Sequence, residues 1–235
     1  MSEPKLELVN FDAHKKIKIS NTNFDIAENH VNAVTVVANE LSTLIHEYPI
    51  FITKHAKTGH YQLMAILGFE SGQNLYLDGQ SWRGSFIPMD ILRRPFHAYI
   101  PDQKNPSQGQ IAIDLAHSWV NEAQGQSLSD EQGKATDYFK RIENIFSQLM
   151  GGNSYTVNAL QVAEEHDLIE SITLSVDLPN GAKKTLNGLY SFNQGKLTAL
   201  TGEALEQCHK SGLLQICHLM LSSGANIQKL VSWSV

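Results

Sequence analysis

The spacing of hydrophobic residues changes character near the middle of the chain. In the first half, apolar and polar residues alternate over short segments such as Leu6–Val9 and Ile111–Leu115, and this period of two is typical of half-buried strands. Beyond residue 130 the apolar positions recur at helical spacing, as at Phe139, Ile142 and Phe146. Strands followed by helices predict an α+β fold rather than a doubly wound parallel one.

The strands of the first half are expected to form a largely antiparallel sheet. Ile50–Thr53, Gln62–Phe69 and Leu75–Leu77 have strand character, and segments with turn chemistry at 57–59 and 70–73 separate them. Connections this short leave no room for helical crossovers. The sequence therefore predicts an antiparallel meander.

Proline and glycine mark the expected ends of several helices. A helix before Pro49 is expected to end near His46, because proline disfavours helical geometry in the residue before it. The first long helix of the second half is expected to end at Gly151–Gly152, with a second short helix around Val157. Further helices make up the C-terminal region.

One hairpin stands out in the second half. Ile172–Leu178 alternates strictly, Pro179–Gly181 supplies turn residues, and Leu186–Phe192 follows as a second strand. Residues 102–109 form the clearest surface loop of the chain. We find no internal repeat and expect a single domain over residues 1–235, with a subdivision near 118–133 into a β-rich and a helix-rich part left open.

Composition and charge exclude several classes of protein. The chain has 235 residues, of which 42% are hydrophobic and 18% charged, as in ordinary globular proteins. Its net charge of −6 supplies no basic field for nucleic acid. The longest apolar run, Leu63–Phe69, is far too short to span a membrane, and Met1–Pro4 does not resemble a secretory signal. We therefore expect a cytoplasmic protein with reduced, buried thiols at Cys208 and Cys217.

The most promising candidates for ligand binding lie between residues 74 and 97. Arginine side chains bind carboxylates and phosphates through two parallel hydrogen bonds, and a tryptophan supplies an aromatic wall. An alternative is that an arginine pairs with an internal acid such as Asp90, and that the asparagine and aspartate merely stabilise turns. We expect the indole and guanidinium groups of this segment to face outward, where a ligand can reach them. The candidate ligand-binding residues are Asn74, Asp78, Trp82, Arg83, Arg93 and Arg94.

Metal and enzyme signatures are weak. Three sets of residues are close enough in the sequence to suggest metal ligands. They are His55 with His60, Asp114 with His117, and the adjacent Cys–His pairs near the C-terminus. None of them reproduces a recognised zinc-site spacing. The chain also contains no nucleophile elbow, phosphate-binding loop or dinucleotide-binding turn. We therefore assign no catalytic residue, no metal ligand and no cofactor.

Several short sequence motifs, in their order along the chain, resemble those of the SapC family of bacterial proteins. The resemblance covers most of the chain and rests on the order and spacing of these motifs. They include Glu40 before Tyr48–Phe51, Leu67–Gly68, Asn74–Asp78, Trp82, Ile87–Pro88, Arg93–Phe96, the segment 125–133, Gly188–Tyr190 and Gly212–Leu214.

What the resemblance implies is an accessory role rather than a known reaction. Members are often encoded beside halogenase-like, cupin-like and outer-membrane receptor proteins, and the family takes its name from bacterial surface layers. Our first hypothesis is an accessory protein that binds a peptide, a protein or a small acidic ligand. The alternatives are a metal- or cosubstrate-dependent modifying enzyme that acts with halogenase-like or cupin-like neighbours, and a structural protein of the surface layer. The sequence predicts no oligomeric state.

Overall fold

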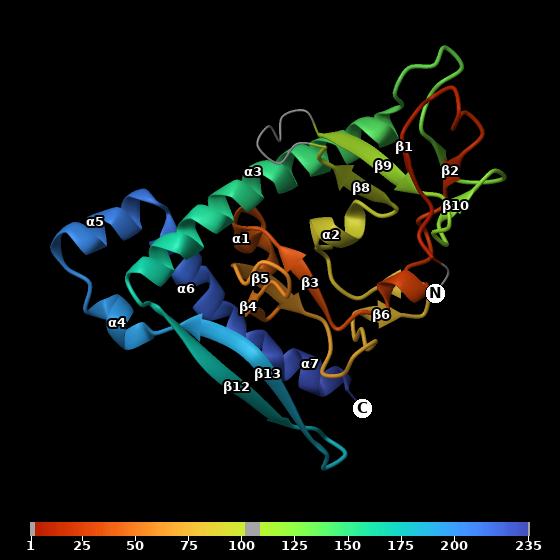
Figure 1. Cartoon of the computed structure of the whole chain (residues 1–235). Helices are drawn as coiled ribbons and strands as arrows, with labels where there is room; N and C mark the ends of the chain where they lie inside the picture. Colours follow the sequence, from red (N-terminus) through yellow and green to blue (C-terminus); the bar gives the residue numbers. More distant parts are fainter. Residues whose placement is uncertain (1–2, 102–108, 235) are drawn as a thin grey trace. The chain divides into compact units, whose positions relative to one another are not determined.

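A computed structural model describes residues 3–101 and 109–234 of the chain (Figure 1). Helices and antiparallel sheets together make up the structure, so the predicted α+β fold is confirmed. The expected surface loop at 102–109 lies, apart from its last residue, outside the described residues. Within the described ranges, no helix is both long enough and apolar enough to cross a lipid bilayer.

The chain divides into two compact units that interleave along the sequence. The first unit comprises Met1–His30, Leu77–Arg83 and Met89–Leu149. The second unit comprises Val31–Tyr76, Gly84–Pro88 and Met150–Val235. The single domain expected from the sequence stays a prediction.

Small antiparallel sheets and one hydrophobic core make up the first unit. One sheet has the order β1-β9-β8, a second has the order β10-β2-β11, and β6 pairs with β7. The elements are β1 (Leu6–Leu8), β2 (Lys18–Ile19), η1 (Ala27–Asn29), β6 (Leu77–Asp78), β7 (Ser81–Trp82), α2 (Met89–Leu92), β8 (Phe96–Tyr99), β9 (Gln110–Asp114), β10 (Val120–Asn121), β11 (Gln126–Ser127) and the start of α3 (Asp137–Glu165). The core contains Ile19, Phe96, Ile113, Trp119, Leu128, Tyr138, Phe139, Ile142 and Phe146.

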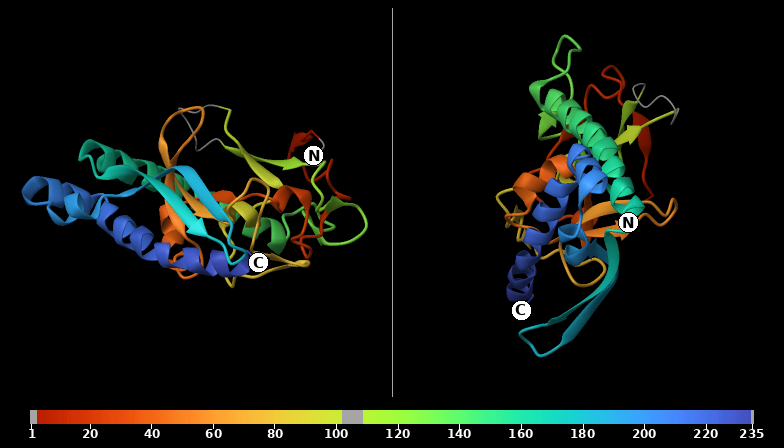
Figure 2. Two further views of the ribbon diagram at one scale, coloured as in Figure 1. Left: turned by 90° about the horizontal axis from the view of Figure 1, so that it is seen from below. Right: turned by 90° about the vertical axis from the view of Figure 1, so that its left-hand side faces the viewer.

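A five-stranded antiparallel sheet of order β12-β13-β4-β5-β3 forms the centre of the second unit. The rest of α3 and the C-terminal helices belong to the same unit (Figures 1 and 2). Its other elements are β3 (Ala33–Val36), η2 (Ala38–Glu40), α1 (Leu41–Leu44), β4 (Ile50–Lys54), β5 (Tyr61–Ile66), β12 (Ile169–Asp177), β13 (Lys183–Phe192), α4 (Gln194–Thr198), α5 (Gly202–Lys210), α6 (Leu213–Ser223), η4 (Gly224–Asn226) and α7 (Ile227–Trp233).

The predicted meander is correct for two strands and wrong for the third. β4 and β5 form the expected hairpin, with Ile52 opposite Leu63. The segment Leu75–Leu77 does not extend this sheet, because its last residue starts β6 and pairs with Trp82 of β7. The place beside β5 is taken by β3, a four-residue strand that the sequence pattern did not single out.

Helix α3 corrects the expectation that a helix ends at Gly151–Gly152. The helix continues through both glycines, so the two predicted helices are one. Neither glycine adopts the left-handed conformation that ends helices. A Cβ atom at Gly152 would collide with the side chain of Asn39 and approach that of Val37. Glycine at 152 therefore allows close helix packing.

The hairpin of β12 and β13 is confirmed, and its two strands run antiparallel from Ile169 to Phe192. The two cysteines are free and buried, as expected. Burial raises the pKa of both thiols, that of Cys217 to about 12.

Candidate functional site

The structure separates Asn74 from the other five candidate ligand-binding residues, because Asn74 belongs to the second unit and the others to the first. Asn74 is buried, and its side-chain oxygen accepts a hydrogen bond from the backbone N–H of Tyr76 at 3.1 Å. This is the turn-stabilising role that formed the alternative interpretation. Asp78 and Arg83 form an ion pair of 3.5 Å at the β6–β7 hairpin.

Trp82 is part of the interior of the first unit. Its side chain is only 9% exposed and packs against Phe24, with ring centroids 5.9 Å apart. Phe24 in turn lies edge-on to Trp119, at 5.7 Å. The expectation that the Trp82 indole faces outward is therefore wrong, because its apolar surface is used for packing. Ligand binding by Trp82 stays a prediction.

Arg93 and Arg94 share one internal acid, Asp90 of α2. The Nε and Nη2 atoms of Arg93 donate to Asp90 Oδ1 at 3.0 and 2.6 Å, while its Nη1 donates to the Phe96 carbonyl at 2.7 Å. Arg94 Nη2 donates to Asp90 Oδ2 at 3.4 Å. The two guanidinium groups are 21% and 14% exposed, so the expected outward presentation is wrong here too.

A second set of contacts holds Arg94 against the η1 segment. Its Nη1 donates to the side-chain oxygen of Asn29 at 2.7 Å and to the main-chain carbonyl of Glu28. Burial lowers the pKa of Arg94, and the neighbouring Asp90 carboxylate opposes that shift. The arginine pair thus joins α2 to the η1 segment, which is a structural role. Whether it also binds a ligand stays a prediction.

His117 lies in the same unit and is buried. Its Nδ1 accepts a hydrogen bond from the Trp119 backbone N–H at 3.1 Å, so the neutral ring carries its proton on Nε2. Within the described part of the chain, that Nε2 has no hydrogen-bond partner. Burial is the main reason why the pKa of His117 falls to about 4.

The acidic neighbours of His117 are engaged by backbone groups. Glu28 accepts hydrogen bonds from the N–H and the hydroxyl of Ser118 at 2.9–3.0 Å. Burial favours the neutral form of Glu28, but these hydrogen bonds outweigh it and lower its pKa. Asp114 Oδ1 accepts from the backbone N–H groups of Lys5 and Ala116 at 2.8 and 3.0 Å. Within residues 3–101 and 109–234, no three His, Cys, Asp or Glu side chains gather as metal ligands.

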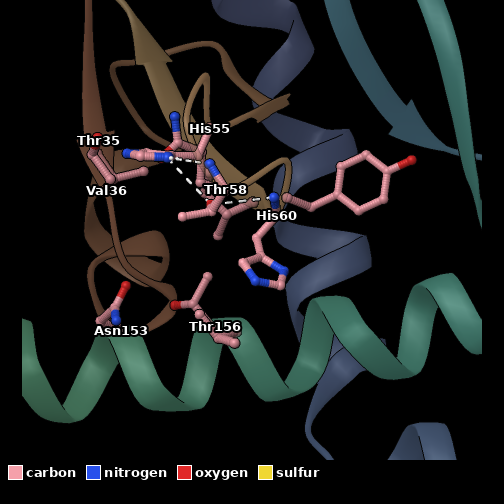
Figure 3. A pocket seen from close by; sticks show the side chains of 11 residues that line it. Thr35, Val36, His55, Thr58, His60, Asn153 and Thr156 are labelled. Atoms are coloured by element: carbon pink, nitrogen blue, oxygen red, sulfur yellow. Dashed lines mark hydrogen bonds between the residues drawn. The ribbon is translucent and has the colours of Figure 1, made fainter. Parts of the chain in front are cut away.

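A cavity of about 190 Å³ lies in the second unit, between β3, the turn that joins β4 to β5, and α3 (Figure 3). His60 points from the turn towards α3, and Asn153 and Thr156 rise from the helix towards it (Figure 3). The residues that line this cavity, which we call the turn pocket, are Thr35, Val36, His55, Thr58, His60, Tyr61, Gln62, Leu63, Asn153, Thr156 and Val157.

Hydrogen bonds within the β4–β5 turn fix the two histidines. The backbone N–H of His55 donates to the His60 carbonyl at 2.8 Å, and Gly59 closes the turn with a positive φ of 72°. The Thr58 N–H donates to His55 Nδ1 at 3.3 Å, so the neutral His55 ring carries its proton on Nε2. These hydrogen bonds fix the backbone of the turn and the His55 ring, while the exposed His60 ring is held by no hydrogen bond to a described residue.

The helix side of the turn pocket is fixed by Thr156. Its hydroxyl donates to the Gly152 carbonyl at 2.6 Å and accepts from the Ala38 N–H at 2.8 Å, so it has no proton left to donate to a ligand. The side chains of His60 and Asn153 make no hydrogen bond to any described residue. Together with the Nε2 of His55, they are polar groups that remain for a ligand.

No acidic residue is among the described residues that line the turn pocket. Beyond the pocket, the Lys54 ammonium lies 4.8 Å from the ring centre of Tyr61 and 5.5 Å from that of Tyr190. An adjoining pocket shares His60, Tyr61 and Val157 with the turn pocket and includes Glu164. The described lining of the turn pocket itself therefore offers hydrogen-bond donors without a carboxylate. Sequence reasoning noticed His55 and His60 only as a metal pair and missed Asn153, because nothing in the spacing indicates that α3 faces the turn.

Comparison with known proteins identifies a family. The family model described as SapC matches residues 9–230 of the 235-residue chain. No curated protein matches the chain, and no solved structure does.

Proposed function

The chain belongs to the SapC family, and from that premise we propose that it is an accessory protein that binds a small carboxylate-bearing ligand in the turn pocket. The observation that carries the proposal is the set of donors, His60 with Asn153 and the Nε2 of His55, in a pocket with no acidic residue among its described lining. Imidazole and amide N–H groups donate to carboxylate oxygens, and such bonds are about twice as strong as neutral ones.

The size of the turn pocket favours a small ligand over a folded protein. Its volume of about 190 Å³ is below the ~300–1,000 Å³ typical of sites for drug-sized molecules. Val36, Leu63 and Val157 line it as well and give an aliphatic part of the ligand an apolar contact. The ligand that fits is a small organic acid or the carboxylate of a short peptide.

The segment 74–97 has a supporting role in this proposal. Trp82 is packed in the core of the first unit, and Arg93 and Arg94 are held by Asp90, so these side chains stabilise the fold. The predicted contribution of Arg83 to ligand binding is tested separately, by Arg83→Ala, because its side chain is 32% exposed.

The test is a titration of the ¹⁵N-labelled full chain with acetate and with succinate, followed by two-dimensional amide NMR. We expect saturable shifts at residues of the turn pocket. His60→Ala and Asn153→Ala should each weaken binding by about tenfold, the effect of losing one charge-assisted hydrogen bond of roughly 1.4 kcal/mol. His218→Ala is the matched control, because His218 is exposed on α6 and does not line the pocket.

Two results would contradict the proposal. One is the absence of saturable shifts with both acids. The other is equal affinity in the wild type and in both pocket variants while His218→Ala also behaves as the wild type. If Arg83→Ala alone weakens binding, the ligand is bound in the first unit and the turn pocket is not the site.

A further inference from the structure

The outer edge of β12 is long and carries no pairing strand within the described residues. β12 lies at one end of the five-stranded sheet, and its nine residues pair only with β13. Such an edge presents a row of backbone N–H and C=O groups that pair readily with another strand. Soluble proteins usually protect long edges with lysine, proline or a bulge.

The middle of β12 carries none of these protections, and its charged residues, Glu170 and Asp177, lie near its two ends. From Ser171 to Val176 the strand contains neither a charged residue nor a proline. The one irregularity of the hairpin lies between the pairs Ile172–Leu189 and Leu174–Leu186, where one residue of β12 faces two of β13. The extra residue therefore belongs to the inner strand, at Gly188 with a φ of 75°, and the edge strand stays regular.

The outer part of the hairpin also has few strand neighbours. β13 pairs with β4 only at Tyr190, opposite Ile52. Figure 1 and the right-hand view of Figure 2 show the turn end of the hairpin extending beyond the other strands of its sheet. A two-stranded ribbon is marginally stable by itself in water, and a third strand stabilises it.

The order of side chains on β12 is close to symmetric about Thr173. If two copies pair antiparallel with Thr173 opposite Thr173, Ile172 faces Leu174 and Ser171 faces Ser175. Glu170 then faces Val176, so no charged residue of β12 is placed directly opposite a like charge. The half-buried side chains of Ile172 and Leu174 from both copies share one face, and the exposed Ser and Thr side chains share the other.

We propose that two copies of this chain associate through their β12 strands, about a two-fold axis at Thr173, and so join two five-stranded sheets into one. The near-symmetric order of side chains favours a second copy over an unrelated strand, because an unrelated strand has no reason to match it. This interface is independent of the turn pocket, since no residue of β12 lines that pocket.

The test is sedimentation velocity of the full chain over a range of protein concentrations. We expect a reversible species of twice the 26.1 kDa chain mass. Thr173→Lys and Thr173→Asp each place two like charges on the two-fold axis and should each weaken association by at least about tenfold. An equimolar mixture of the two variants places Lys opposite Asp and should restore the dimer.

Thr185→Lys is the matched control, because Thr185 is an exposed threonine on the inner strand, opposite Ser175. It should associate like the wild type. A wild type that stays monomeric at all concentrations overturns the proposal. The edge of β12 would then be available to a strand from another protein. A dimer that persists in both Thr173 variants, or a mixture that stays monomeric, overturns the proposed axis.

Discussion

The rings of Tyr48 and Tyr76 stack with their centroids 4.4 Å apart and their planes at 21°. Both side chains are fully buried. Each hydroxyl donates to a main-chain carbonyl, Tyr48 to that of Phe86 and Tyr76 to that of Glu47. The two tyrosines belong to motifs on which the family resemblance rests, and in the structure they support the fold of the second unit.

Removing the Tyr76 hydroxyl should lower the stability of the protein. Tyr76→Phe leaves the Glu47 carbonyl without this donor, which costs about 1–2 kcal/mol in the free energy of unfolding. Urea denaturation followed by circular dichroism measures the difference. Tyr99→Phe is the control, because Tyr99 is 49% exposed and should change stability by less than about 0.5 kcal/mol. Equal stability of the two variants would show that the buried hydroxyl is not needed.

Two glycine substitutions should change stability in opposite directions. A Cβ atom at Gly84 would lie 2.7 Å from Glu47 Oε2 and 2.8 Å from the Tyr48 hydroxyl, so Gly84→Ala should destabilise the protein by about 1–3 kcal/mol. Gly151→Ala meets no atom and lies within α3, so it should stabilise by about 0.5–1 kcal/mol. Thermal unfolding of both variants gives the two signs. A stabilising Gly84→Ala would contradict the close packing at Glu47.

Removing the acid shared by the two arginines should lower the stability of the protein more than removing an exposed acid. Asp90→Asn leaves the partly buried Arg93 and Arg94 without their counter-charge, and we expect a loss of roughly 2–4 kcal/mol in the free energy of unfolding. Asp137→Asn breaks an ion pair with Lys140 in which Asp137 is 88% exposed, and it should cost less than about 1 kcal/mol. Chemical denaturation of both variants at neutral pH compares them. Similar losses would mean that the arginine pair is not held by Asp90.

His117 should make stability fall as the solution becomes acidic. Its pKa is about 4 in the folded protein, against 6.5 as the ordinary value, so between these two pH values the unfolded chain binds a proton that the folded chain does not. The contribution is fully present above pH 6.5 and is lost as pH falls to about 4, by on the order of 3 kcal/mol.

The lowered pKa values of Glu28 and Glu47 act at the acid end of this window and below it. Their contributions are present above about pH 4.5, the ordinary value, and are lost only on further acidification. His117→Asn keeps an acceptor for the Trp119 N–H and should reduce the decline between pH 6.5 and 4.5. Part of the decline should remain, because burial also lowers the pKa of His97. His30→Asn, at an exposed histidine, is the control and should leave the decline intact. Parallel curves for wild type and His117→Asn would contradict the assignment.

The predictions that succeeded rest on local patterns. The turn at Pro179–Gly181 and the alternation on both sides of it predicted the β12–β13 hairpin. Both signals are local, because strand periodicity and turn-forming residues can be recognised within a few positions. The β4–β5 hairpin was predicted for the same reason. The alternative that an arginine pairs with Asp90 was also found from near neighbours, at spacings of three and four residues.

The features that were missed depend on residues far apart in the sequence. Gly152 is typical of a helix end, but its lack of a side chain is explained by the close approach of Asn39, more than a hundred positions earlier. The turn pocket is missed because its lining comes from β3, the β4–β5 turn and α3. Trp82 was expected on the surface because its pairing with Phe24, more than fifty positions earlier, leaves no local signal.

The interleaving of the two units along the chain constrains how the gene can be divided. The polypeptide passes from one unit to the other after residues 30, 76, 83, 88 and 149, so any contiguous piece of coding sequence that contains one unit whole also contains part of the other. A truncation that removes all of one unit therefore always removes part of the other. Recombination between relatives preserves each unit only when segments on both sides of a crossover are inherited from compatible parents.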